Sequence, residues 1–370
     1  MTLSPVFRSP AAVRLLEEEG VWERLAPALL SQADAVRTHH AQLRELLDSR
    51  FLAPPPPLPE PGEEATPLGL AFLQEYFFLI LFRSLFESLG VPRERLQLYA
   101  ELNFGIKGTI TAADNLFDDQ SKSLLPLRPG SGARSASVLQ LICFERLIRR
   151  TGDRAVEAGM MDDTERDGIL RGLIDTMAEI GGLEGSEEGG VAEIPQPDEM
   201  VERVHRVRGG LLFTLGWVAP KLLERGAVGE RVRRAEPAVA RLGTAFQIVD
   251  DLTDFEFDLG RRSHNLLVSE IHHQGSPEQQ RRLQELWAGA PAAPDLVEGL
   301  FRQPARAVLD RARGEARAAF ATLEELGFWF PARLADGLVH AIAGREGIAR
   351  VEALAATGAP DDAYQEHSAE

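Results

Sequence analysis

The chain has very little cysteine: Cys143 is the only one in 370 residues. An internal disulfide is therefore excluded, which is typical of a reducing compartment and predicts a cytoplasmic protein. Thiolate metal sites are excluded as well, and the eight histidines show no metal-binding spacing such as HExxH. Oxygen ligands remain as the basis for any metal site, and they suit magnesium.

Long apolar runs are also missing. The most apolar stretch covers residues 68–89 and is interrupted by four polar side chains: Gln74, Glu75, Arg83 and Glu87. A membrane span needs about 20 predominantly apolar residues, so we expect a buried helix here and no stable membrane insertion. Residues 1–20 show no secretory signal pattern.

Positive charge is scarce. The formal net charge is −17, and only three of the 40 basic residues are lysines. A nucleic-acid-binding protein would show a basic stripe, so we expect no nucleic-acid partner. An anionic substrate would have to be held largely by arginine, whose guanidinium fork grips phosphate with two hydrogen bonds.

Strand-like alternation is nearly absent, and helical periodicity dominates. With 44% hydrophobic residues, the pattern predicts one large all-α domain over residues 63–357. Residues 1–62 are expected to form N-terminal helices and a proline-rich loop, and residues 358–370 a polar tail. Helices are expected over residues 21–51, 68–89, 92–119, 133–151, 162–180, 197–224, 229–258, 277–288, 295–326, 331–343 and 345–356, and a glycine-rich loop over 181–190.

Two acidic clusters stand out within this helical pattern. One contains Asp114, Asp118 and Asp119, and the other contains Asp250 and Asp254, with Asp258 one turn later. Residues four apart share a helix face, so each cluster stacks carboxylates that repel one another by a few tenths of a kcal/mol per pair. Such repeated stacking predicts a bound cation, and all six aspartates are candidate magnesium ligands.

The second cluster and its flanks resemble the second aspartate-rich motif of the trans-isoprenyl diphosphate synthases. Phe246 and Gln247 precede a DDxxD pattern, and a basic step follows at Arg261 and Arg262. The first cluster resembles the first DDxxD motif of that family with asparagine in the second slot. Residues 208–213 resemble a KTxxLF segment in which arginine and glycine replace lysine and threonine.

The resemblance implies the class I isoprenoid synthase fold, a single large helical bundle around a deep apolar cavity. In that superfamily two acidic helices bind three magnesium ions, which clamp the diphosphate of an allylic isoprenyl substrate. It therefore implies that Asp114, Asp118, Asp250, Asp254 and Arg208 are catalytic. Diphosphate contacts are expected from Arg208, Gln247, Arg261 and Arg262, and Lys107 is either a further diphosphate contact or an intrahelical ion pair. The family commonly dimerises, which makes a homodimer a possible assembly.

The chain departs from the chain-elongating members of that family. They bind isopentenyl diphosphate through an upstream GKxxRP segment and an arginine pair after the first motif. The first segment is missing here, and Ser123 and Leu124 stand at the arginine positions, with Arg128 further on. A second diphosphate in a low-dielectric mouth needs cations.

These departures lead us to expect a class I terpene synthase, a lyase that cyclises the carbocation from an allylic diphosphate of fifteen to twenty-five carbons. In the family that the chain resembles, the residues just before the first motif set the cavity depth. The small or medium side chains of Thr109, Ile110, Ala112 and Ala113 therefore imply room for such a long substrate. The alternative is a prenyltransferase that condenses isopentenyl diphosphate with an allylic diphosphate. A third hypothesis, from another class, is a non-catalytic partner subunit of a heteromeric prenyl synthase.

Overall fold

The computed structural model describes residues 10–18, 20–117, 121–128, 132–293 and 295–355. In these residues every regular element is a helix, and Leu52 and Leu127 form an isolated antiparallel β-bridge. The all-α class predicted from the sequence is therefore confirmed. The predicted ligands Asp118 and Asp119, and the polar tail 358–370, lie outside the described residues.

The elements follow one another along the whole described chain. The first half contains α1 (Pro10–Glu17), α2 (Val21–Leu46), η1 (Ser49–Phe51), α3 (Pro67–Ser88), α4 (Arg93–Phe117), α5 (Ala133–Glu157) and α6 (Asp163–Ser186). The middle contains α7 (Pro197–Met200), η2 (Val201–Leu211), α8 (Leu212–Thr214), η3 (Leu215–Trp217), α9 (Val218–Leu223), α10 (Gly226–Thr253) and α11 (Phe255–Arg261). The last part contains α12 (Leu266–Gln274), α13 (Pro277–Trp287), α14 (Arg302–Glu325), η4 (Ala332–Leu334), α15 (Ala335–Ile342) and α16 (Gly344–Ala355).

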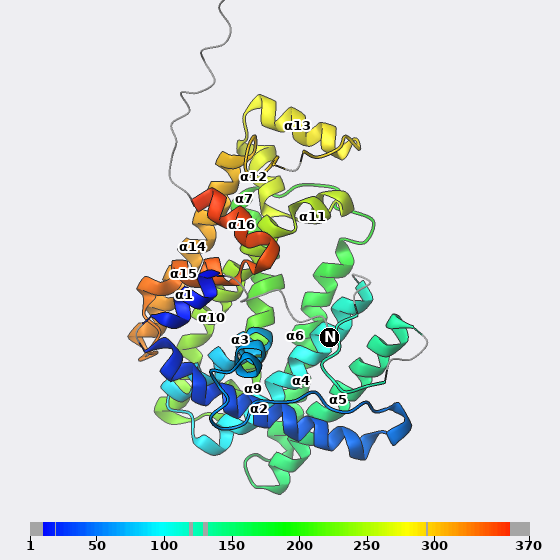
Figure 1. Ribbon diagram of the computed structural model, residues 1–370, viewed down its shortest axis with the longest axis vertical. Coiled ribbons are helices and arrows are strands. Elements are labelled where there is room, and N and C mark those ends of the chain that lie inside the picture. Colours follow the sequence, from blue (N-terminus) through cyan, green and yellow to red (C-terminus); the bar gives the residue numbers. More distant parts are fainter. Residues whose placement is uncertain (1–9, 19, 118–120, 129–131, 294, 356–370) are drawn as a thin grey trace, which may run out of the picture.

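Helix α10 is the central element of the bundle (Figure 1). It packs against α14 on one side and against η2 on another, while α4 packs against α5. Helix α2 lies across α3, α4 and α5, and α1 packs against α15 near the C-terminal end of the chain. The buried apolar side chains of all these helices belong to one continuous core.

Helix α3 is a core helix with a membrane-like composition. Among the described helices it alone is long and apolar enough to cross a membrane, yet 61% of its most apolar window is buried in the protein. Its aromatic side chains pack on rings from η3, α8 and α10: Phe82 lies 5.3 Å from Trp217, and Phe78 lies 4.8 Å from Phe213 and 5.3 Å from Phe246, centroid to centroid. Burial against other helices thus explains the apolar composition of α3.

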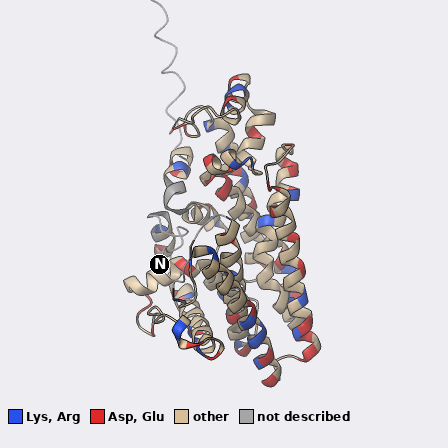
Figure 2. Cartoon of the chain, turned by 90° about the vertical axis from the view of Figure 1, so that its right-hand side faces the viewer, with Lys and Arg blue, Asp and Glu red and all other residues tan. Residues whose placement is uncertain are grey.

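Charged residues of both signs are interspersed along the helices (Figure 2). The chain therefore carries its formal net charge of −17 without separating its basic residues onto one face in this view. Because opposite charges alternate, local ion pairs such as that of Arg37 with Glu60 (2.9 Å) recur over the surface.

Several predicted boundaries were wrong. The range 197–224, predicted as one helix, is divided into five elements, from α7 to α9. One of them, η2 (Val201–Leu211), is a π-helix. The predicted loop at 181–190 is helical as far as Ser186, and the sequence analysis missed α1 and α12. Helix α14 begins at Arg302 rather than at residue 295.

Candidate active site

The second acidic cluster lies across a break between two helices. Helix α10 ends at Thr253, Asp254 has φ −103° and ψ 15°, and α11 begins at Phe255. The four-residue backbone ladder continues through the break, from Asp254 N to Asp250 O (2.8 Å) and from Asp258 N to Asp254 O (2.9 Å). Asp250, Asp254 and Asp258 therefore stay on one side despite the kink.

Ionisation of these carboxyl groups is unfavourable, because they are half-buried beside other carboxylates. Burial, together with the charges of Asp254 and Asp251, raises the pKa of Asp250 to about 8. Burial, together with the charge of Asp251, raises the pKa of Asp258 to about 8. Negative charge is thus gathered here without enough positive charge to balance it.

The two acidic clusters are coupled through charge. The charge of Asp114, at the end of α4, also raises the pKa of Asp250, although the two residues lie on helices distant in the sequence. Asp114 is exposed, whereas Asp250 is half-buried. Two acidic helices across one mouth stay a prediction.

We tested the fit of these residues to magnesium. Within the described residues, no three acidic, histidine or cysteine side chains are placed so that they could hold a metal ion as they stand. The donor chemistry nevertheless fits: Asp250 and Asp258 are carboxyl groups with raised pKa values, and a bound cation would lower them. The six predicted metal ligands stay a prediction.

Asp251 has a structural role next to these predicted ligands. Only 1% of it is exposed, and its Oδ2 accepts hydrogen bonds from His205 Nε2 (2.8 Å) and from the backbone N–H of Leu266. Asn265 Nδ2 donates to the Asp251 carbonyl (2.8 Å) and to Asp258 Oδ2 (2.8 Å). The segment after α11 is thereby tied to the end of α10.

Arg350 reinforces the same break from the C-terminal side. Its Nη1 donates to the carbonyl oxygen of Leu252 (2.7 Å), and its guanidinium also pairs with Glu256 (2.7 Å) and Glu298 (2.8 Å). Sequence reasoning missed both His205 and Arg350, because neither stands in a motif and both act through contacts between distant segments.

Arg208, predicted to contact diphosphate, pairs with glutamates in this structure. Its Nε lies 2.5 Å from Glu184 Oε1, and its Nη2 lies 2.6 Å from Glu187 Oε1. Burial acts to lower the pKa of Arg208, but the charges of Glu184, Glu187 and Asp251 outweigh burial, and the pKa is raised. Asp250 also lies within electrostatic reach of this cation.

The glycine after Arg208 has a packing reason. A methyl group on Gly209 would lie 2.2 Å from the carbonyl oxygen of Gly243, and one on Gly243 would lie 2.1 Å from that of Gly209. Helices η2 and α10 therefore touch backbone to backbone directly before the second cluster. This contact accounts for glycine at the position where the family pattern has threonine.

Gln247 and Lys107 lie near opposite clusters. Gln247 is buried, and its Nε2 lies 3.4 Å from Asp250 Oδ2. Lys107 pairs with Glu75 of α3 (3.4 Å), so the ion pair is between helices rather than within one. Burial lowers the pKa of Lys107, although the charges of Glu75 and Asp114 act against it.

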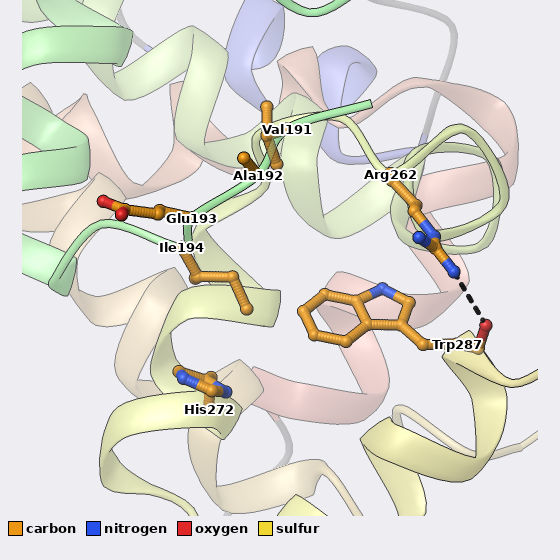
Figure 3. A pocket seen from close by; sticks show the side chains of 7 residues that line it. All are labelled: Val191, Ala192, Glu193, Ile194, Arg262, His272 and Trp287. Carbon is orange, nitrogen blue, oxygen red and sulfur yellow. Dashed lines mark hydrogen bonds between the residues drawn. The ribbon is translucent and has the colours of Figure 1, made fainter. Parts of the chain in front are cut away.

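Arg261 and Arg262, the basic pair after the second cluster, contact other residues than the aspartates in the bonds described here. Arg261 lies over the ring of Phe257, 5.1 Å from its centroid. Arg262, which has a left-handed backbone (φ 58°), lies 3.4 Å from the carbonyl oxygen of Trp287 through its Nη2. Figure 3 shows it at one end of a pocket of about 530 Å³ whose lining is Val191, Ala192, Glu193, Ile194, Arg262, His272 and Trp287. Among the described aspartates of the two clusters, none lines this pocket.

The loop after the first cluster is pinned by buried amides. Asn115 Nδ2 donates to the Lys122 carbonyl (2.8 Å), and its Oδ1 accepts from the Lys122 N–H (3.0 Å). Gln140 Oε1 accepts from the N–H of Leu124 (2.8 Å), whose side chain is buried. Arg128 donates to the Leu52 carbonyl (2.7 Å). At the positions where the family has two arginines, this loop carries one serine and one buried leucine.

The apolar interior between these helices is filled by aromatic rings. Phe213 lies 5.7 Å from Phe246, centroid to centroid, and 5.4 Å from Phe82. A second pocket, of about 430 Å³, shares Glu193 and Ile194 with the first, and none of the described aspartates of the clusters lines it. The deep apolar cavity stays a prediction.

Comparisons with known proteins agree with this architecture. No family model and no curated protein sequence matches the chain. Among solved structures, a decaprenyl diphosphate synthase from Rhodobacter capsulatus matches at 19% identity and a TM-score of 0.54, over 86% of this chain and 99% of that one. A polyprenyl synthase from Caulobacter crescentus, solved with calcium and isoprenyl diphosphate, matches at 14% and 0.56, over 90% and 98%. A geranylgeranyl pyrophosphate synthetase from Pyrococcus horikoshii matches at 16% and 0.52, over 85% and 98%.

Proposed function

We propose that this protein, which has the fold of the isoprenyl diphosphate synthases, is a magnesium-dependent enzyme that ionises an allylic isoprenyl diphosphate. The observation that carries the proposal is that the charge of Asp114, on α4, adds to those that raise the pKa of Asp250, on α10. Two carboxylates from separate helices thus feel each other's charge. A divalent cation and a diphosphate would remove that conflict.

The residues would divide the work as follows. Asp114, Asp250 and Asp254 would hold magnesium, which supplies positive charge to the departing diphosphate when bound. Asp118, Asp119 and Asp258 are proposed to complete the set. Gln247, beside Asp250, would orient a diphosphate oxygen, and Arg208 would approach the diphosphate from η2. The aromatic rings around Phe213 would exclude water and face the developing carbocation.

For the fate of the carbocation, we place prenyl transfer to isopentenyl diphosphate first. The solved structures that share this fold at TM-scores above 0.5 are named as decaprenyl, polyprenyl and geranylgeranyl diphosphate synthases. This order reverses the expectation from the sequence, which favoured cyclisation. Fold similarity at these identities supports this order by analogy.

Cyclisation by a terpene synthase is the second candidate. The observation that favours it is the pinned loop after the first cluster, in which Leu124 is buried and Arg128 is bound to the Leu52 carbonyl. This loop presents no arginine pair for a second diphosphate. A cyclase needs only one diphosphate site.

The deciding experiment is a product assay with magnesium and allylic diphosphates of ten to twenty-five carbons, each with and without isopentenyl diphosphate. Longer diphosphates formed only with isopentenyl diphosphate support prenyl transfer, whereas a volatile terpene formed without it supports cyclisation. Asp175→Ala, at an exposed position of α6, is the matched control for aspartate variants of the clusters. Absence of any turnover would contradict both candidates and favour the non-catalytic partner subunit.

A further inference from the structure

Glu187 is a buried carboxylate that joins three segments of the chain. It is 8% exposed and follows the C-terminal end of α6. Its Oε1 lies 2.6 Å from Arg208 Nη2 of η2 and 2.6 Å from His264 Nδ1, and its Oε2 accepts from the backbone N–H of His264 (3.2 Å). Both oxygens are therefore used, and the carboxylate is fixed between a helix and the turn that follows α11.

Glu184 completes the hold on the same cation. Its two oxygens lie 2.5 Å from Arg208 Nε and 3.3 Å from Arg208 Nη2. The fork of the guanidinium thus faces α6, in the planar two-bond geometry that arginine and carboxylate prefer. The side chain of Arg208 is only 15% exposed, so water does not compete strongly for it.

Arg208 has a second set of carboxylates near it. Its neighbour Gly209 touches the backbone of Gly243, two turns before Asp250 on α10, and the charges of Asp250 and Asp251 both interact with the guanidinium. A buried guanidinium stays charged and moves to whichever carboxylate is available, because an unpaired buried charge is costly. An Arg208 that moved onto Asp250 would neutralise the charge that a divalent cation needs.

We propose that Glu184 and Glu187 are positioning residues that hold Arg208 away from Asp250 and so keep that carboxylate open to a divalent cation. The proposal rests on the proposed function only in taking Asp250 as a metal ligand. The proposal explains why Glu184 and Glu187 lie beside a site where negative charge already exceeds positive charge. Their work is to restrain a competing cation rather than to bind the metal.

The test is a binding measurement on the full chain, with manganese as the probe and electron paramagnetic resonance reporting free Mn²⁺. The variants are wild type, Glu184→Gln/Glu187→Gln, and the same pair combined with Arg208→Gln. We expect the double variant to bind Mn²⁺ about tenfold more weakly, which corresponds to about 1.4 kcal/mol. Removal of Arg208 in the triple variant should restore the wild-type affinity, because the competing cation is then gone.

The controls separate this proposal from folding and from the proposed function. Glu199→Gln breaks the exposed ion pair with Arg203 nearby and should leave Mn²⁺ affinity unchanged. Unchanged affinity in the double variant, or weakened affinity that Arg208→Gln does not restore, would overturn the inference. Wild-type protein that binds no Mn²⁺ would instead overturn the metal site of the proposed function. Thermal unfolding of each variant shows whether a loss of affinity is a loss of fold.

Discussion

The two acidic helix ends are built differently. At the end of α4, Asp114 is exposed and its neighbour Asn115 is turned inward to bind the backbone of Lys122. At the junction of α10 and α11, the aspartates are surrounded by fixed partners: His205 on Asp251 and Asn265 on Asp258. The second cluster is thus organised before any ligand arrives.

The two clusters nevertheless share one feature: in each, the residue next to a predicted ligand turns inward. In the first cluster, an amide in the second acidic slot fixes a loop, so that slot does not face the mouth. In the second cluster, the adjacent aspartate, Asp251, is also turned inward. Both helices therefore use the residue next to the predicted ligand for structure, because neighbouring side chains on a helix point about 100° apart.

The largest effect should come from the predicted ligands themselves. Asp114→Ala and Asp254→Ala are each expected to reduce kcat by about 10²–10³-fold, because each removes charge that would hold the metal against the leaving diphosphate. Steady-state assays with the active allylic diphosphate check this. If only Asp254→Ala reduces kcat, the two helix ends are not equivalent parts of one site.

The next largest effect is the loss of stability when a glycine at a close helix contact is replaced by alanine. Gly243→Ala places a methyl group 2.1 Å from the carbonyl oxygen of Gly209, and backbone cannot move aside. Gly108→Ala, on α4, places one 2.1 Å from the ring of Phe144, which can shift. We expect a loss of about 3 kcal/mol or more at Gly243 and about 1–3 kcal/mol at Gly108. Urea unfolding measures both, and equal losses would contradict the distinction between backbone and ring.

Restoring the family motif should weaken the first helix end. Asn115→Asp replaces the amide donor to the Lys122 carbonyl with an oxygen that repels it. We expect a loss of about 1–3 kcal/mol in the free energy of unfolding, with no gain in Mn²⁺ affinity. Tighter Mn²⁺ binding by this variant would show that position 115 faces the metal after all.

The smallest effect, per pH unit, is the change in stability that the second cluster causes. The pKa of Asp258 is about 8 in the folded protein and about 4 when unfolded, so the folded state holds more protons and loses stability as pH rises from 4 to 8. Asp258→Asn keeps an oxygen for Asn265 and lacks the charge. Its stability relative to wild type should therefore increase by about 1.4 kcal/mol for each pH unit within that range, measured without metal.

The reference for this pH series is Asp175→Asn, which removes an exposed carboxylate far along the chain in α6. A difference between Asp258→Asn and wild type that stays constant with pH would contradict the raised pKa. Added magnesium should reduce the difference between these two proteins, because a bound cation relieves the repulsion in wild type.

Much of the fold could be predicted from the sequence because long helices repeat apolar residues at helical spacing over several turns. Helices α3 and α10 were predicted within a few residues of their observed starts. The π-helix η2 was not, since its five-residue ladder departs from the 3.6-residue period used to recognise helices. Helix α12 is short, and the one local signal that could have found it was Asn265, whose side chain caps its first turn.

The candidate site was predictable only where acidic residues recur at helical spacing in the sequence. Stacked aspartates identified both helix ends, whereas the partners of Arg208 were missed because Glu184 and Glu187 belong to a segment that glycines made look like a loop. Ion pairs between distant segments leave no local pattern. The inward turn of Asn115 was hidden for the same reason, since its partner is backbone.

The contact between Gly209 and Gly243 restricts the mutational routes open to this protein. A threonine at residue 209 would strike the carbonyl of Gly243, and a larger residue at 243 would strike the carbonyl of Gly209. Neither change can be compensated by altering the other side chain, because each clash is with backbone. The KT pair of the trans-isoprenyl diphosphate synthases could therefore be introduced at residues 208 and 209 only together with a separation of η2 from α10, which no substitution at these two positions provides.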